Sequence, residues 1–256
     1  MTEPSFEGRR IVVTGGGSGI GAAIARTFAA HGASVTVMGR RIDTLQPIAD
    51  TLGAAAQAIV CDVCDDRSVA RAFAVARDGG PIDVLVNNAG AVESVRLART
   101  TVEHWRRALD VNLTGAFLCQ QQVLPAMVER GFGRVVNVAS TAALKGYPYV
   151  AAYVAAKHGL LGLTRAAAIE LAKTGVTLNA VCPGYTDTDI VREAVATIAR
   201  KTGRDAAEAR AALEAANPQG RMVTPDEVAQ AVLWLARPDS AAITGQAIVV
   251  AGGEVM

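Results

Sequence analysis

Short β-branched segments alternate with longer segments of helical apolar spacing along the whole chain, and this alternation constrains the fold most. The strand-like segments cover residues 11–14, 35–38, 58–60, 84–86, 135–138, 176–181 and 247–250. Two successive parallel strands need a crossover connection, usually a helix, that covers one face of the sheet. The sequence therefore predicts an α/β fold with a Rossmann-like, doubly wound parallel sheet of about seven strands.

One region, residues 186–217, departs from the alternation because arginine, lysine and glutamate are interspersed there with alanine. This composition predicts one or two exposed helices inserted before the last strand, and we expect them to act as a substrate lid. No internal repeat, low-complexity tract or linker divides the chain. A single domain of this length is ordinary for an α/β protein.

Charge and composition exclude several kinds of partner. The 256-residue chain has a formal net charge of +1, so we expect no nucleic acid and no membrane partner. Residues 111–128 are uncharged, but they include Asn112, three consecutive glutamines and Pro125, which indicates a buried helix rather than a membrane span. The first apolar segment is preceded by acidic as well as basic residues (Glu3, Glu7, Arg9 and Arg10), unlike the positively charged start of a signal peptide, and we expect a cytoplasmic protein.

The four cysteines are Cys61, Cys64, Cys119 and Cys182, and only the first two have C-x-x-C spacing. A zinc site would need a second such pair or suitably spaced histidines, which the sequence does not offer, so we expect no metal. Two interpretations of the Cys61–Cys64 pair stay open. It is either a redox pair or, more simply, two small buried apolar side chains in a reducing compartment.

A glycine-rich segment joins the first predicted strand to the first predicted helix. Gly15, Ser18, Gly19, Ile20 and Gly21 stand in this turn. Glycine permits a tight turn and lets backbone N–H groups at a helix N-terminus approach a pyrophosphate. A P-loop would need lysine and serine or threonine after the last glycine, and a nucleophile elbow would need glycine two residues after the serine; neither is present. The segment therefore predicts dinucleotide binding.

Tyr153 and Lys157 are spaced i, i+4 in a predicted helix over residues 151–173, which places both side chains on one face, about 5–6 Å apart at Cβ. A free phenol has a pKa of about 10, too high for acid/base work near neutrality. A lysine charge at about 5.5 Å favours the phenolate by roughly 3 kcal/mol at an effective dielectric constant of about 20. We therefore expect Lys157 to lower the pKa of Tyr153. The alternative is a surface pair without a function.

Two further polar residues stand at positions that suit a site. Ser140 follows the predicted strand over residues 135–138, at the edge of the sheet where open α/β folds bind ligands. Asn112 lies in a mostly apolar helix start, where a buried amide needs hydrogen-bond partners.

Together these residues resemble the short-chain dehydrogenase/reductase family. The resemblance covers nearly the whole chain and rests on the turn from Thr14 to Gly21, Asp62, Asn87-Asn88-Ala89-Gly90, Asn112, Ser140, Tyr153-x-x-x-Lys157 and Pro183-Gly184. It implies that residues 1–256 are one dinucleotide-binding and catalytic domain. It also implies an oxidoreductase that interconverts a secondary alcohol and a ketone.

The resemblance implies catalytic roles for Asn112, Ser140, Tyr153 and Lys157. Tyr153 would exchange the proton with the substrate, Ser140 would steady the reacting oxygen, Lys157 would hold the nicotinamide ribose, and Asn112 would position a water of the proton relay. The implied cofactor contacts are Gly15, Ser18, Gly19, Ile20, Gly21, Arg40, Asp62, Val63, Asn88, Ala89, Gly90, Tyr153, Lys157, Pro183, Gly184, Thr186 and Thr188. A homotetramer through helices over residues 111–130 and 151–173 is also implied.

The residues after the second predicted strand bear on the choice of cofactor. An NAD enzyme usually places an acid here for the ribose hydroxyls, but this chain has Gly39 followed by Arg40. Arginine can pair with the 2′-phosphate of NADP. Against this, Ser18 stands where many NADP-using relatives carry a basic residue. We favour NADP(H) over NAD(H).

The segment from Tyr153 and residues 179–184 resemble 3-oxoacyl reductases, 3-hydroxyacyl and 3-hydroxybutyrate dehydrogenases and type II polyketide ketoreductases. Members that act on free acids hold the carboxylate near positions 142 and 150, where this chain has Ala142 and Val150. We therefore expect an apolar pocket for a ketone whose carboxyl group is masked or absent. The expected pocket residues are Ser140, Ala142, Leu144, Val150, Tyr153, Tyr185 and Ile190.

A basic cluster beyond the fourth predicted strand consists of Arg96, Arg99, Arg106 and Arg107. It would meet the phosphates of coenzyme A or an acidic carrier protein, unless it is only an exposed helix surface. Three functions stay open. The first is oxidoreduction of a 3-oxoacyl/3-hydroxyacyl thioester, and the second is dehydrogenation of a cyclic or aromatic secondary alcohol. The third, a dinucleotide-binding regulator without turnover, is disfavoured by the complete catalytic set.

Overall fold

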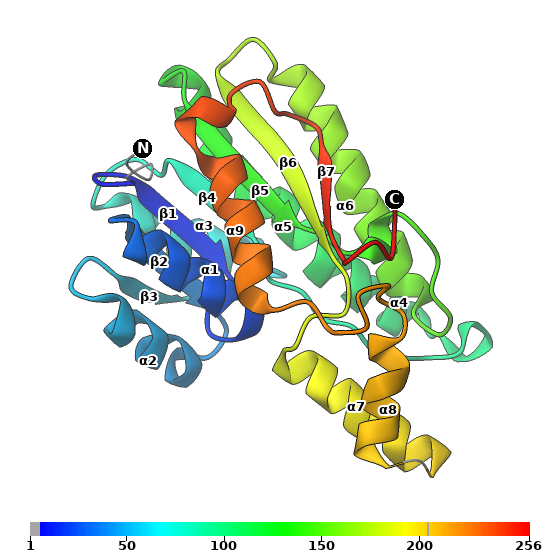
Figure 1. Cartoon of the computed structure of the whole chain (residues 1–256). Coiled ribbons are helices and arrows are strands. Elements are labelled where there is room, and N and C mark those ends of the chain that lie inside the picture. The colour runs from blue at the N-terminus through cyan, green and yellow to red at the C-terminus, as the bar shows by residue number, and fades with distance from the viewer. Residues whose placement is uncertain (1–5, 204) are drawn as a thin grey trace.

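The computed structural model describes residues 6–203 and 205–256. In this part of the chain all seven strands form one parallel sheet in the order β3-β2-β1-β4-β5-β6-β7 (Figure 1). The strands are β1 Arg10–Thr14, β2 Ser34–Gly39, β3 Gln57–Val60, β4 Val84–Asn87, β5 Gly133–Val138, β6 Val176–Pro183 and β7 Ala247–Val250. The predicted Rossmann-like architecture is confirmed.

Helices cover both faces of the sheet. They are α1 Gly19–Ala30, α2 Ile42–Leu52, α3 Asp66–Arg77, α4 Val102–Leu109, α5 Gly115–Glu129, α6 Ala151–Glu170, α7 Asp189–Thr202, α8 Ala206–Glu214 and α9 Pro225–Ala236. Buried side chains of α1, α2 and α9 pack against one face, and those of α3, α5 and α6 pack against the other. Every residue of β5 and β6 is buried, as expected for parallel strands that are covered on both faces. The buried residues include the polar Arg134, Asn137, Thr177 and Asn179.

The order of the strands places the site. The chain leaves β1 in one direction across the sheet and later crosses to β4 on its other side, so a crevice is expected beyond the carboxyl ends of β1 and β4. The glycine-rich turn follows β1 at this switch point, and Asn88 follows β4. Both turns therefore meet at one edge of the sheet.

Three local features differ from the predictions or extend them. The predicted helix over residues 151–173 ends at Glu170, because a turn follows that leads through the positive-φ residue Gly175 into β6. The apolar helix start around Asn112 is a π-helical turn, Asp110–Thr114, between α4 and α5. Residues 186–217 contain the two helices α7 and α8, which project beyond the ends of the strands (Figure 1).

None of the helices within residues 6–203 and 205–256 combines the length and the apolar run that crossing a bilayer requires. The uncharged segment 111–128 forms the π-helical turn and most of α5. Its residues Cys119, Val123 and Met127 pack in the core against the sheet.

Candidate active site

The glycine-rich turn is packed so closely that side chains would not fit. A Cβ on Gly21 would collide with the carbonyl oxygen of Gly15, and a Cβ on Gly15 would lie 2.9 Å from the Cα of Ala89. Helix α1 begins directly after Ser18, whose side chain makes no capping hydrogen bond. The first N–H groups of this helix are thus available to an anion, as a dinucleotide pyrophosphate requires.

The turn after β4 is tied to the end of β1 by hydrogen bonds. The hydroxyl oxygen of Thr14 accepts from the N–H groups of Asn88 (3.0 Å) and Ala89 (3.1 Å). The side-chain amide of Asn88 donates to the carbonyl oxygens of Thr14 (3.0 Å) and Gly15 (3.1 Å). The two turns therefore form one unit. Thr14 was not among the predicted site residues, although it directly precedes the first glycine of the motif.

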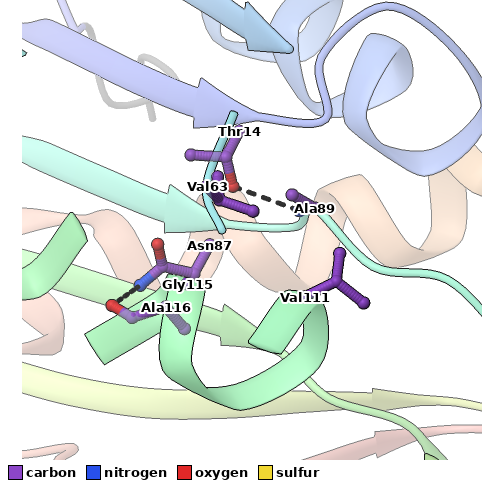
Figure 2. A pocket seen from close by; sticks show the side chains of 7 residues that line it. All are labelled: Thr14, Val63, Asn87, Ala89, Val111, Gly115 and Ala116. Atoms are coloured by element: carbon purple, nitrogen blue, oxygen red, sulfur yellow. Dashed lines mark hydrogen bonds between the residues drawn. The ribbon is translucent and has the colours of Figure 1, made fainter. Parts of the chain in front are cut away.

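A small cavity lies just below this unit. Its lining includes the predicted cofactor residues Val63 and Ala89, with Thr14 and Asn87 beside them (Figure 2). The side-chain amide of Asn87 donates to the Asn137 side-chain oxygen at 2.9 Å, whereas its own buried oxygen has no hydrogen-bond partner among the described residues. No local pattern in the sequence signals this polar interior.

Arg40 and Asp62 stand at the carboxyl ends of β2 and β3. Arg40 is exposed, and its guanidinium has no hydrogen bond or ion pair within the described residues. A carboxylate oxygen of Asp62 accepts from the N–H of Cys64 at 3.0 Å, and the N–H of Asp62 donates to the Ser68 hydroxyl at 3.0 Å. The turn after β3 is thereby fixed, and Arg40 is accessible to a ligand.

The Cys61–Cys64 pair is poorly suited to redox chemistry. Burial, reinforced by the charge of Asp62, raises the pKa of both thiols to about 11. A thiolate is the reactive form of cysteine, and a raised pKa keeps it scarce. The redox interpretation is therefore disfavoured. The expected burial is confirmed for Cys61 but wrong for Cys64, which is exposed.

Ser140, Tyr153 and Lys157 come together between β5 and α6. The Ser140 hydroxyl lies near enough to the Tyr153 phenol to lower the pKa of the phenol as a hydrogen-bond partner. The Lys157 ammonium lies 5.6 Å from the centre of the Tyr153 ring and donates to the Val138 carbonyl oxygen at 2.9 Å. The i, i+4 spacing on α6 thus places both side chains beside the end of β5.

The pKa expectation for Tyr153 was wrong for the protein's own groups. Burial raises the pKa of this phenol, and the hydrogen bond from Ser140 opposes that effect only in part. Burial also lowers the pKa of Lys157 from 10.5 to about 8. The i, i+4 spacing reveals the attraction between the two charged forms but not the cost of removing each from water.

Asn112 is held by the chain segment that follows β4. Its side-chain oxygen accepts from the Ala91 N–H at 3.2 Å, and its amide group donates to the carbonyl oxygens of Ala91 (2.8 Å) and Ala108 (3.0 Å). A Cβ on Gly90 would lie 2.9 Å from the Asn112 oxygen and 3.6 Å from the Lys157 nitrogen. Asn112 and Lys157 therefore both border Gly90, and the π-helical turn is a feature often found at functional sites.

The segment after β6 crosses towards the glycine-rich turn. The Thr186 hydroxyl donates to the Gly184 carbonyl oxygen at 3.0 Å, and the Thr188 hydroxyl donates to the Thr186 carbonyl oxygen at 3.2 Å. A Cβ on Gly19 would lie 3.1 Å from a methyl carbon of Thr188. The predicted cofactor contacts after β6 thus face those after β1.

The predicted pocket residues are brought to the same edge of the sheet with different exposures. Leu144, Val150, Tyr153 and Tyr185 are partly exposed, but Ala142 is only 2% exposed, within the short helix Thr141–Ala143. The side chain of Ile190 lies outside the described residues. Ala142 therefore offers little surface to a substrate.

The loop that follows Ser140 also carries polar side chains, which were not among the expected pocket residues. Tyr147 lies in the loop between Ser140 and α6, and its hydroxyl is bonded to the Thr141 hydroxyl at 2.6 Å and donates to the Glu254 carboxylate. The Lys145 ammonium lies 3.1 Å from the same carboxylate. Glu254 is far from this loop in sequence, so no local pattern signals the contact.

The fold and the site define a class of protein. A doubly wound sheet with a glycine-rich turn at its switch point, beside a Tyr153–Lys157–Ser140 group, is the arrangement of a nicotinamide-dependent oxidoreductase that acts on CH–OH groups. The residues around the turn fit such a cofactor, because the N-terminus of α1 has no side-chain cap and its first N–H groups are available to a pyrophosphate.

Comparison with known proteins identifies the family. The family model described as enoyl-(acyl carrier protein) reductase matches residues 15–254, and the chain belongs to the short-chain dehydrogenase/reductase family. It is 36% identical to the 3-oxoacyl-(acyl-carrier-protein) reductase FabG of Escherichia coli, over 98% of this chain and 99% of that protein. It is also 36% identical to the D-beta-hydroxybutyrate dehydrogenase of Rhizobium meliloti, over 94% of this chain and 96% of that protein.

A solved structure gives the same result for the fold. The crystal structure of a single-substitution variant of actinorhodin polyketide ketoreductase with NADPH superposes with a TM-score of 0.92. The two sequences are 40% identical, and the match covers 96% of this chain and 97% of that one. The chain is therefore an NAD(P)-dependent ketoreductase or dehydrogenase.

Proposed function

We propose that this enzyme reduces the ketone of a neutral 3-oxoacyl thioester, or oxidises the matching 3-hydroxyacyl thioester, with NADP(H) preferred to NAD(H). The observation that carries the substrate class is the charge pairing beside Ser140. The Lys145 ammonium is bonded to the buried carboxylate of Glu254, and no other ion pair or free cation of the described residues lies in the loop from Ser140 to α6. An anionic substrate would find no unpaired cation there, and burying an unpaired anion costs several kcal/mol.

The catalytic proton belongs to Tyr153. Because burial raises the pKa of this phenol, it is protonated near neutrality and can donate to the ketone oxygen in the direction of reduction. The Ser140 hydroxyl, bonded to the same phenol, binds the reacting oxygen and fixes its position. The nicotinamide supplies the hydride when it is bound.

Lys157 and Asn112 support this proton transfer. With a pKa of about 8, Lys157 is mostly charged at neutral pH and favours the phenolate that forms when Tyr153 gives up its proton. Asn112 is fixed against Ala91 and borders Gly90 together with Lys157, a place from which it can hold a water of the proton relay.

The cofactor would lie along the edge formed by the ends of β1 to β6. The N-terminus of α1 would hold the pyrophosphate with Gly15, Ser18, Gly19, Ile20 and Gly21. Asp62, Val63, Asn88, Ala89 and Gly90 would border the adenosine and the ribose, and Pro183, Gly184, Thr186 and Thr188 the nicotinamide. Arg40, exposed and without a hydrogen-bond partner among the described residues, would pair with the 2′-phosphate.

One observation favours a second candidate substrate, a cyclic or aromatic ketone. The rings of Tyr147 and Tyr185 meet edge to face with their centres 6.4 Å apart. Aromatic rings of a substrate are favourably packed against such a pair. The crystal structure with which this chain superposes is itself of a polyketide ketoreductase.

The surface offers two further proposals. Arg96, Arg99, Arg106 and Arg107 are all exposed and are placed to meet the phosphates of coenzyme A or an acidic carrier protein. Phe117 on α5 and Ile169 on α6 are 41% and 80% exposed, which supports a homotetramer through these helices.

α7 and α8 would serve as the lid over the substrate. A cytoplasmic location stays a prediction.

Turnover of matched substrates tests the proposed function. Acetoacetyl-CoA or a neutral cyclic ketone should be reduced with NADPH, and acetoacetate should have a kcat/KM at least about 100-fold lower, because an unpaired anion costs several kcal/mol and each 1.4 kcal/mol is a factor of about ten. The loss of NADPH absorbance measures the rate with each of these substrates. Comparable kcat/KM values for acetoacetate and its thioester would contradict a neutral substrate.

A further inference from the structure

The polar side chains beside Ser140 form a connected group, which we name the Glu254 cluster: Thr141, Lys145, Tyr147 and Glu254. The Tyr147 hydroxyl donates to the carboxylate and therefore accepts from the Thr141 hydroxyl, 2.6 Å away. Lys145 reaches the same carboxylate at 3.1 Å, and its ammonium lies 5.0 Å from the centre of the Tyr147 ring. Glu254 thus joins two parts of one loop.

Glu254 is carried into the cluster by the segment after β7. Gly252, with φ +59°, packs so closely on Asn217 that a Cβ would collide with the side-chain oxygen, and Gly253 packs on Pro218. A Cβ on Gly184 would lie 2.7 Å from the second carboxylate oxygen of Glu254. The carboxylate is therefore enclosed between β6, the end of the α8 segment and the Tyr147 loop.

The exposure of the two charged groups is unequal. The Glu254 side chain is 2% exposed, whereas the Lys145 side chain is 39% exposed. The ammonium is thus the accessible partner, and its charge is balanced by a carboxylate that solvent screens weakly. Burial raises the pKa of the phenols of Tyr147 and Tyr185, and the negative charge of Glu254 raises both pKa values further. The electrostatic field of Glu254 therefore reaches both rings.

The cluster is close to the reacting groups. Thr141 follows Ser140 directly, and Ser140 is bonded to the Tyr153 phenol. From Thr141 to Lys145 there are three polar contacts, through Tyr147 and Glu254. A carboxylate two bonds from a reacting ketone would therefore approach this region of charge.

We propose that Glu254 determines substrate selectivity by masking the charge of Lys145, so that the site admits neutral ketones and excludes anionic ones. The proposal rests on the ketoreductase function proposed above and deepens it. Lys145 would bind a substrate carboxylate if its charge were unpaired. Glu254 removes that possibility and repels a second carboxylate.

The test is Glu254→Gln, which removes the charge but keeps an oxygen that accepts from Tyr147. Acetoacetate and ethyl acetoacetate are the matched anionic and neutral substrates. The ratio of their kcat/KM values, acetoacetate over the ester, should rise at least about tenfold, or 1.4 kcal/mol. This ratio is measured in one preparation, so a loss of correctly folded enzyme cancels.

Two variants make the test specific. Glu170→Gln removes the same charge from an exposed residue at the far end of α6 and should leave the ratio unchanged. In the double variant Lys145→Met with Glu254→Gln, the rise in the acetoacetate-to-ester ratio should disappear, because the lysine charge that Glu254 masks is absent. An unchanged ratio in Glu254→Gln, or a gain that persists in the double variant, would overturn the proposal.

Failure of the proposed function gives a different result. If the wild-type enzyme reduced neither acetoacetyl-CoA nor ethyl acetoacetate, the ketoreductase proposal would fail, and the masking would still be testable. Calorimetry with acetoacetate should show at least about tenfold tighter binding to Glu254→Gln than to the wild type. Equal affinity would reject the masking of Lys145.

Discussion

The cofactor side and the substrate side of the candidate active site are built from different chemical groups. On the cofactor side, the turns after β1 and β4 are joined by backbone groups and by the small side chains of Thr14 and Asn88. On the side proposed for the substrate, the loop after Ser140 carries the long side chains of Lys145 and Tyr147, which are joined through the carboxylate of Glu254.

This difference bears on how each side is specified and altered. The glycine-rich turn tolerates no Cβ at Gly15 or Gly21, so its shape depends on the absence of side chains. The Glu254 cluster depends on which side chains are present, and one substitution changes its charge without moving the backbone. We therefore expect substitutions around the glycine-rich turn to alter cofactor affinity but not substrate preference. Substitutions in the Glu254 cluster should alter substrate preference but not cofactor affinity.

The largest effect on turnover is expected for Tyr153, which lies between the cofactor side and the substrate side. Tyr153→Phe removes the proton donor, and general acid catalysis contributes about 100- to 10,000-fold, so kcat should fall by that factor. The Kd for NADPH, measured by fluorescence titration, should change less than about twofold, since the hydroxyl acts mainly in the transition state.

The matched control is Tyr149→Phe, which lies in the loop just before α6, is 59% exposed and should keep full activity. A Tyr153→Phe enzyme that retains more than about a tenth of the wild-type kcat would remove Tyr153 from the acid/base role. A large loss of NADPH affinity would show that the two sides are not separable at this residue.

A smaller effect, confined to the cofactor side, is expected for Arg40→Ala. A hydrogen bond to a charged group contributes about 1.5–3 kcal/mol, so the Kd for NADPH should rise about 10- to 150-fold. The Kd for NADH should barely change, because NADH lacks the 2′-phosphate. Binding titrations with both cofactors measure this.

The neighbouring Arg41→Ala is the control for Arg40, because Arg41 is also exposed. Equal losses of NADPH and NADH affinity, or a wild-type preference for NADH, would contradict the assignment of the 2′-phosphate to Arg40. A changed ratio of kcat/KM between ketones would contradict the separation of the two sides.

The same difference explains what the sequence could predict. The strands and the two turns follow from local signals, because β-branched runs, glycines and the Tyr153–Lys157 spacing each act within a few residues. The residues expected around the glycine-rich turn accordingly lie together, with Thr188 facing Gly19 and Gly90 bordering Asn112 and Lys157.

The substrate side could not be predicted in this way. Glu254 and Tyr147 are joined over 107 positions of sequence, and a single glutamate near the chain end carries no local signal of its partner. The direction of the pKa shift of Tyr153 was wrongly predicted for a related reason. A spacing on a helix reveals the neighbouring charge, but the extent of burial depends on every element that packs around the phenol.

The smallest effect is expected on the substrate side, for Tyr147→Phe. The change keeps the ring beside Tyr185 but removes the hydroxyl that joins Thr141 to Glu254. One intramolecular hydrogen bond contributes about 0.5–1.5 kcal/mol, so the KM for a neutral ketone should rise about 2- to 10-fold. Because Tyr153 and Ser140 keep their own hydrogen bond, kcat should stay within about twofold of the wild type.

Steady-state kinetics with ethyl acetoacetate, beside the control Tyr149→Phe, distinguish the possible roles of Tyr147. A fall in kcat with an unchanged KM would mean that the Tyr147 hydroxyl acts on the reacting oxygen itself, through Thr141 and Ser140. A changed Kd for NADPH would mean that the loop also holds the cofactor, and the division into two sides would fail. An increase in KM alone supports a wall whose side chains position the substrate, since the removed hydroxyl faces Glu254 and not the Tyr153 phenol.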